Sequence, residues 1–251
     1  MKKYVNLFVF VFMIGACLSQ GRAQTKSAVS YKNPVVDIAM PDPTVIKAAD
    51  GYFYVYATES TRNVPIMKSK DLVEWTYCNT AFTNKTRPRF EPKAGIWAPD
   101  INYINGKYVL YYAMSVWGGE QTCGIGVATA NSPQGPFTDH GKMFRSNEIG
   151  VQNSIDPSLL QYEGRNYLVW GSFRGIYVIE LTADGLSIMP GAKKKRIAGT
   201  AFEAVYIHKH GDYYYMFASI GSCCQGVKST YKVVVGRSKK VWGPYKDKTG
   251  K

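Results

Sequence analysis

Beyond its first two dozen positions, the sequence has no sustained apolar repeat with a period of 3.6 residues, which argues against a helical fold. It is also short of acidic residues, with 18 Asp and Glu against 31 Lys and Arg and a formal net charge of +13. Such a balance can attract nucleic acid. However, the basic residues are scattered, and the densest run (KKKR, residues 193–196) accompanies no recognisable nucleic-acid module. We interpret that run as a solvated loop between strands and expect no nucleic-acid partner.

Cysteine is rare, and its spacing does not indicate a zinc site. Of the five cysteines, Cys17 lies in the leader described next, which leaves Cys78, Cys123, Cys223 and Cys224. An exported protein can form disulfides. The adjacent Cys223 and Cys224 are expected to be hard to bridge to each other without strain. The sequence therefore leaves the pairing of these four residues open.

No apolar run is long enough for a comfortable membrane span. The run at residues 5–17 has a single polar residue and follows a positively charged start, which is typical of an export signal. Small residues at positions 21 and 23 predict cleavage after residue 23, so we expect a periplasmic or extracellular protein. Residues 14–17 (IGAC) also resemble a lipoprotein cleavage box, which would leave Cys17 lipidated and the protein tethered to the cell surface.

Aromatic residues are plentiful at 14%, with 19 Tyr, which favours strands and sugar-stacking surfaces. Many lie in a recurring pattern: an acidic residue, usually beside Pro, then apolar residues, a Gly turn and an aromatic strand, as in residues 41–56 (PDPTVIKAADGYFYVY). Further copies begin near residues 97, 154 and 202, and each is typical of two strands joined by a tight turn. A second motif follows three of the copies, near residues 69–75, 132–139 and 238–247. The stretch between the first and the second motif is long enough for another pair of strands. Four strands per step of about fifty residues indicate the blades of an all-β propeller.

Equivalent residues of propeller blades converge at one mouth of the central axis. The acidic residues of the four copies are Asp42, Asp100, Asp156 and Glu203. An Asp beside a Pro is common in turns, but turn capping does not require an acid at the start of every repeat. Like charges that meet in a pocket raise one another's pKa and destabilise the fold, so their convergence predicts a functional site.

From about Asn33 to its end, the chain resembles glycoside hydrolase family 43, five-bladed propellers that attack arabinan and xylan. The resemblance implies Asp42 as general base, Glu203 as general acid, and Asp156 as the carboxylate that orients the acid and modulates its pKa. The segment 97–100 (WAPD) resembles a conspicuous family segment in which Trp97 stacks on the sugar. The resemblance also implies inversion at the anomeric carbon, with base and acid carboxyls roughly 6.5–9.5 Å apart and a water between them.

Two stretches narrow the resemblance, because residues 171–176 (GSFRGI) and 222–231 (SCCQGVKSTY) are similar to those of endo-acting α-1,5-L-arabinanases. We therefore expect a monomer that cuts arabinan internally. The alternatives are an exo-acting arabinofuranosidase or β-xylosidase of the same family, and an inactive glycan-binding propeller. Besides Trp97, we expect Asp100, Asn153, Ser154 and Ser172 to contact the sugar.

The sequence departs from the family pattern in length. It reaches Lys251 where a fifth blade is expected to begin, so we expect residues 24–251 to hold about four blades of a C-terminally truncated propeller. A smaller departure is Ala204-Val205 after the acid, where the family often has Gly or Ala and then Pro.

The family resemblance also raises a metal site. Members usually carry a His near the axis that helps hold a metal ion or water cluster, and none of His140, His208 and His210 lies in a matching segment. We expect no cofactor to be required for the chemistry. A structural ion such as calcium near the axis is the only metal that the resemblance suggests.

Overall fold

Short Tyr- and Val-rich strands separated by Gly turns make up nearly all the regular structure. The computed structural model describes residues 30–250. The predicted export signal and Cys17 lie outside these residues. Residues 33–250 belong to one unit, described here by itself. Its two helical segments, α1 (Ser146–Ile149) and η1 (Gly226–Lys228), are a single turn each, so the described residues contain no helix long and apolar enough to cross a membrane.

The described strands form four antiparallel sheets, each of consecutive strands. The first sheet contains β1 (Thr44–Lys47), β2 (Phe53–Tyr56), β3 (Pro65–Ser69) and β4 (Thr76–Thr80). The second contains β5 (Gly95–Ile104), β6 (Lys107–Ser115), β7 (Gly124–Ala130) and β8 (Thr138–Arg145). The third contains β9 (Ser158–Tyr162), β10 (Arg165–Trp170), β11 (Ile176–Glu180) and β12 (Lys195–Ala198). The fourth contains β13 (Glu203–His210), β14 (Tyr213–Ile220) and β15 (Lys232–Ser238).

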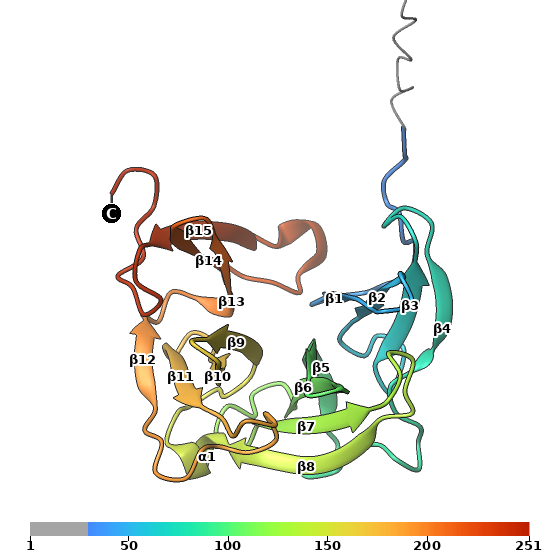
Figure 1. Ribbon diagram of the computed structural model, residues 1–251, viewed down its shortest axis with the longest axis horizontal. Coiled ribbons are helices and arrows are strands. Elements are labelled where there is room, and N and C mark those ends of the chain that lie inside the picture. Colours follow the sequence, from blue (N-terminus) through green and yellow to red (C-terminus); the bar gives the residue numbers. More distant parts are fainter. Residues whose placement is uncertain (1–29, 251) are drawn as a thin grey trace, which may run out of the picture. The chain divides into compact units, whose positions relative to one another are not determined.

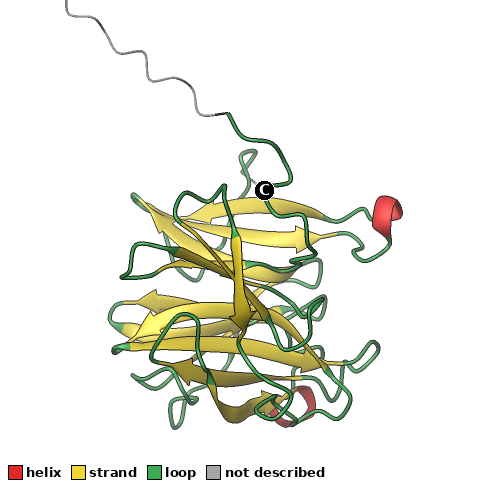
Figure 2. Ribbon diagram, turned by 90° about the vertical axis from the view of Figure 1, so that its right-hand side faces the viewer, coloured by secondary structure: helices red, strands yellow, loops and turns green. Residues whose placement is uncertain are grey.

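The four sheets surround a common centre, with the first strand of each sheet innermost (Figure 1). Figure 2 shows the same unit from the side, with strands forming its body and the short helical segments at its periphery. The predicted all-β propeller with four blades in this chain is confirmed.

Apolar side chains fill the space between neighbouring blades. Three clusters of buried residues each draw on two consecutive sheets, with Tyr54 and Leu110 in the first, Val109 and Leu168 in the second, and Val169 and Met216 in the third. The second and third sheets are packed on both faces in this way, and the first and fourth on one face each, so the inner strands are held at fixed positions around the axis.

The inner strands begin with a shared backbone feature that corrects the predicted equivalence of the acidic residues. Asp42, Ala98, Asp156 and Ala204 all have a left-handed backbone, with φ between 41° and 57°. The first three each precede a Pro. Asp100 lies two residues further along β5, beyond a bulge between Trp97 and Asp100. The prediction that it is equivalent to Asp42 and Asp156 is therefore wrong, because the repeat aligns Ala98 with them.

Candidate active site

A cavity of about 640 Å³ lies where the inner strands converge. Its lining includes residues from the start of every blade, among them Asp42, Ala98, Asp156 and Ala204. The blades therefore bring Asp42 and Asp156 together although 114 positions, 156 minus 42, separate them in the sequence. Glu203 directly precedes the lining residue Ala204 and is close enough to Asp156 to repel its charge.

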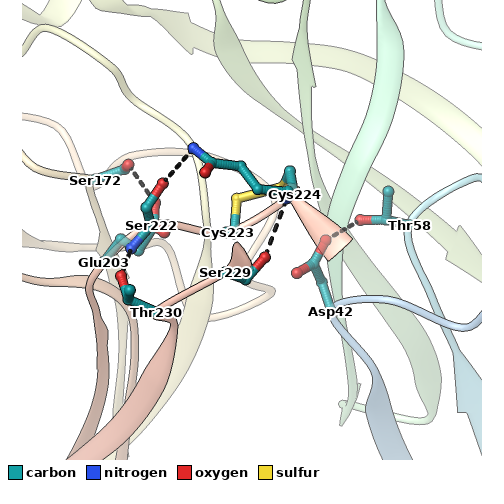
Figure 3. Close-up of a disulfide and its surroundings, with 10 residues drawn as sticks. Asp42, Thr58, Ser172, Glu203, Ser222, Cys223, Cys224, Ser229 and Thr230 are labelled. Carbon is teal, nitrogen blue, oxygen red and sulfur yellow. Dashed lines mark hydrogen bonds between the residues drawn. A yellow bond between two sulfur atoms is a disulfide. The ribbon is translucent and has the colours of Figure 1, made fainter. Parts of the chain in front are cut away.

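Asp42 is held by a hydroxyl group from the first blade. Thr58, which follows β2, donates a hydrogen bond from Oγ1 to Asp42 Oδ2 at 2.5 Å (Figure 3). The backbone N–H of Ala98 donates to the same Thr58 hydroxyl oxygen at 2.7 Å. The hydroxyl proton is thus directed at Asp42, and the position of this carboxylate is coupled to the second blade.

Asp156 has the clearest electrostatic signature of the three carboxyls. Burial raises its pKa well above the usual range, and the nearby charges of Glu203 and Asp42 raise it further. The backbone N–H of Ala204, 3.1 Å from Oδ2, acts in the opposite direction. The raising effects outweigh the lowering one, so the pKa of Asp156 lies above that of an isolated aspartate.

Glu203 is buried at the start of β13, next to a bulge between Glu203 and Tyr206. Its Oε2 accepts a 2.6 Å hydrogen bond from Ser172 Oγ, in the turn between β10 and β11. The Tyr231 hydroxyl interacts with Glu203 and with Ser219, and burial raises the pKa of Tyr231. Sequence reasoning missed Thr58 altogether and gave Tyr231 no role, although Tyr231 lies in one of the stretches that resemble arabinanases.

The remaining predicted sugar contacts differ in how much surface they offer. Asn153 is half-buried, whereas Ser172 is fully buried beneath Glu203. Ser154 is also fully buried, and its hydroxyl donates to Val151 O and accepts from Trp170 Nε1. Ser154 has no surface left for a ligand in this conformation, so its role is to hold the third blade together.

Asp100 lines the cavity but is used within the protein. Its Oδ2 accepts hydrogen bonds of 2.7 Å from the Leu159 backbone N–H and of 2.7 Å from Asn102 Nδ2. Burial raises its pKa to about 6, and these hydrogen bonds only partly offset that effect. Asp100 therefore links β5 of the second blade to β9 of the neighbouring third blade.

Two Trp side chains form an aromatic surface on the second blade. Trp97 is partly buried against Ala113, Cys123 and Ile155. Trp117 lies 5.6 Å from it between ring centroids, at an interplanar angle of 51°, and is 78% exposed. A flat, exposed ring beside a second Trp is suited to stacking on sugar rings.

Cys223 and Cys224 form a disulfide with each other, a pairing that the sequence leaves open. Cys78 and Cys123 are free. Cys224 adopts a left-handed backbone (φ 67°) within an exposed loop. Figure 3 draws the disulfide with Asp42 and Glu203 among its surroundings.

Within residues 30–250, no three His, Cys, Asp or Glu side chains are grouped so that they could hold a metal ion. His140 pairs with Thr129 on the second blade, while His208 and His210 lie against Tyr206 and Tyr215 on the fourth. The donor set that a His-assisted metal site requires is thus not assembled from the described residues, and no step below is derived through a metal.

The chain is similar to known proteins in both sequence and structure. The family model described as glycosyl hydrolases family 43 matches residues 31–251. An extracellular endo-α-(1→5)-L-arabinanase of Bacillus subtilis is 39% identical over 224 residues, which cover 84% of this chain and 68% of the relative. An extracellular exo-α-(1→5)-L-arabinofuranosidase of Cellvibrio japonicus is 36% identical, covering 84% and 67%. The chain thus spans about two thirds of the length of these relatives.

Solved structures show the same fold. An α-L-arabinanase of Cellvibrio cellulosa complexed with arabinohexaose has a TM-score of 0.75 and 32% identity, covering 85% of this chain and 75% of the other. A family 43 endo-arabinanase of Bacillus licheniformis has a TM-score of 0.75 and 35% identity, covering 86% and 77%.

Proposed function

The chain belongs to glycosyl hydrolase family 43, and we propose that it is an inverting glycoside hydrolase that cleaves α-1,5-linked L-arabinan internally during plant polysaccharide degradation. The observation that supports this proposal most directly is the convergence of three carboxyl groups from three different blades: Asp42 and Asp156 line one cavity, and Glu203 lies beside Asp156. The endo-arabinanase of Bacillus subtilis and a relative from Aspergillus flavus, named a probable arabinan endo-1,5-α-L-arabinosidase and 30% identical, support arabinan as the substrate.

In the proposed mechanism, Asp42 acts as general base and takes a proton from the attacking water. Glu203 acts as general acid and protonates the departing glycosidic oxygen as the bond to the anomeric carbon breaks. Asp156 repels negative charge on Glu203 and so favours the protonated acid before the reaction. Paired carboxyls suffice for this chemistry without a cofactor.

The cavity and its rim supply the binding surface for the polysaccharide. We propose that the Trp97 and Trp117 rings stack on sugar rings. An exo-acting enzyme is the second candidate, and the similarity to the exo-α-(1→5)-L-arabinofuranosidase of Cellvibrio japonicus supports it.

We further propose that the protein acts as a monomer outside the cytoplasm. The relatives from Bacillus subtilis and Cellvibrio japonicus are named as extracellular proteins. Release after residue 23 and a lipid anchor on Cys17 are the two forms that the leader permits, and the mass of the mature protein distinguishes them.

The test is to incubate the exported chain with debranched linear arabinan and to size the products. Short arabino-oligosaccharides support internal cleavage, whereas release of monomer or one fixed small product supports the exo alternative. Glu203→Gln keeps the shape of the side chain and removes the acid, so it should release nothing. A chain that is folded by circular dichroism, binds arabinan and releases nothing contradicts the hydrolase and favours a glycan-binding role.

A further inference from the structure

Two polar side chains, Asn153 and Ser172, form a series of hydrogen bonds that ends at Glu203. Ser172 Oγ donates to Glu203 Oε2 at 2.6 Å. Asn153 Nδ2 lies 3.0 Å from Ser172 Oγ and 3.2 Å from the Ser172 backbone oxygen. Ser172 is 1% exposed and Glu203 9%, so solvent has little access to these hydrogen bonds.

The direction of each hydrogen bond follows from the groups involved. A backbone carbonyl only accepts, so the Asn153 group that faces Ser172 must be its NH₂ and not its oxygen. The Asn153 oxygen then faces Cys123 Sγ, at 4.0 Å, which can donate to it. Since Asn153 donates to Ser172 Oγ, the single hydroxyl proton of Ser172 is left for Glu203 Oε2.

We propose that Asn153 and Ser172 are positioning residues that keep Glu203 Oε2 as a hydrogen-bond acceptor and thereby assign the acid proton to Oε1. This inference rests on the proposed role of Glu203 as general acid. It differs from the sequence-based prediction, in which Ser172 contacts the sugar itself.

The assignment has a consequence for the reaction. The O–H bond at Oε1 breaks as its proton moves to the glycosidic oxygen, and the electron pair stays on the carboxyl group. The negative charge that develops is shared with Oε2, where the Ser172 hydrogen bond strengthens because hydrogen bonds to charged acceptors are stronger. Ser172 thus stabilises the transition state more than the ground state, which accelerates the chemical step.

Three other groups face Glu203, and the Tyr231 hydroxyl among them also hydrogen-bonds its carboxyl. Asp156, which precedes β9, repels charge on Glu203. Ser219 of β14 pairs with Glu203 across the sheet. Tyr231, before β15, keeps its proton over the pH range of an assay because burial raises its pKa. A Ser172 variant therefore removes one hydrogen-bond donor to Glu203 and leaves the Asp156 and Tyr231 side chains in place.

The experiment measures pH–rate profiles on linear arabinan for the full chain and its variants. Ser172→Ala should lower kcat by about ten- to a hundredfold with little change in KM, and should move the alkaline limb of kcat to higher pH by about one unit. Asn153→Asp keeps the Ser172 hydroxyl but places a second carboxylate beside it, which competes with Glu203 for the hydroxyl proton. The alkaline limb of kcat should therefore also move to higher pH. Ser172→Thr keeps the hydroxyl and should restore the original profile.

A matched control is Ser238→Ala, which removes a buried hydroxyl from β15 that accepts only from the Lys240 N–H. It should leave both limbs in place. A loss of kcat in Ser172→Ala with an unmoved alkaline limb would mean a purely structural role. A rise in KM at constant kcat would instead mean direct contact with the sugar. Either result overturns the proposal.

A second measurement is independent of turnover. The Glu203 carboxyl, labelled with ¹³C and identified by the loss of its signal in Glu203→Gln, is titrated by NMR. Its midpoint should rise in Ser172→Ala and in Asn153→Asp, and an unchanged midpoint refutes the proposal. If the parent chain does not cleave arabinan, the proposed function fails, and the titration alone still decides the inference.

Discussion

Thr58 joins the first two blades at the carboxylate of Asp42. Its hydroxyl donates to Asp42 Oδ2 at 2.5 Å and accepts from the Ala98 N–H at 2.7 Å. A donated hydrogen bond stabilises the ionised carboxylate, which is the form that a general base requires.

Thr58→Val, which keeps the shape and removes the hydroxyl, should therefore lower kcat by about ten- to a hundredfold, because Asp42 loses its charge-assisted hydrogen bond. The KM for arabinan should change little. Thr58→Ser keeps the donor and serves as the control. Equal kcat values for the Val and Ser variants would show that Thr58 acts only through packing.

Asp156 should destabilise the folded protein at neutral pH. Burial, then Glu203 and Asp42, raise its pKa in the folded state, whereas an unfolded Asp has a pKa of about 3.9. The folded state thus binds more protons above that value, and stability falls as pH rises through this window.

Asp156→Asn removes this charge, so it should raise Tm at pH 7, by about 2–4 °C for each kcal/mol relieved. The gain should disappear near pH 3.5, where the Asp is protonated in both states. Activity on arabinan should be lost at every pH. A variant that is less stable than the parent at pH 7 would mean that the Asp156 hydrogen bond to Ala204 outweighs the repulsion.

The fold and the principal carboxyls could be predicted because their signals are local. A Gly turn, an alternating strand and an acid beside a Pro are each readable within a few residues, and their recurrence locates the blades. The position of Asp100 could not be predicted, because the bulge in β5 changes which residue faces the mouth of the axis. Thr58 and Ser172 were missed as positioning residues because their partners, Asp42 and Glu203, become neighbours only after the chain folds.

Variants of Asp100 test whether this residue contacts the substrate or only links β5 to β9. Asp100→Ala leaves the Leu159 N–H without its acceptor in a buried place, which should lower the free energy of unfolding by about 1–3 kcal/mol. KM for arabinan should hardly change. Asp100→Asn retains an acceptor oxygen and should recover most of the loss. A large rise in KM in a fully stable Asp100→Asn protein would restore Asp100 as a sugar ligand.

Trp117 should contribute to binding and not to stability, because 78% of its surface is exposed. Trp117→Ala should raise KM for long arabinan by up to about tenfold and leave Tm unchanged. Trp117→Phe keeps a flat ring, so its KM for long arabinan should be close to that of the parent. Trp97→Ala is the contrasting variant, since Trp97 packs on Cys123 and Ile155 and should lose both binding and stability. An unchanged KM in Trp117→Ala would remove this ring from the binding surface.

The Cys223–Cys224 disulfide should influence catalysis through the loop that carries it. The loop is closed at its base, where Ser222 N–H donates to Thr230 Oγ1 at 3.1 Å and Thr230 N–H donates to Ser222 O at 3.0 Å. Tyr231, the next residue, interacts with Glu203. Opening the disulfide should widen the range of conformations of the loop and weaken the placement of Tyr231.

We expect a mild reductant to lower kcat severalfold with little effect on Tm, because the loop is exposed while the sheets hold the core. Alkylation followed by mass measurement checks that Cys223 and Cys224 are the residues that react. The double variant Cys223→Ser, Cys224→Ser should start at the lower rate and be insensitive to reductant. If reductant slows this variant as much as the parent, the effect arises elsewhere, and if it slows neither, the base of the loop alone positions Tyr231.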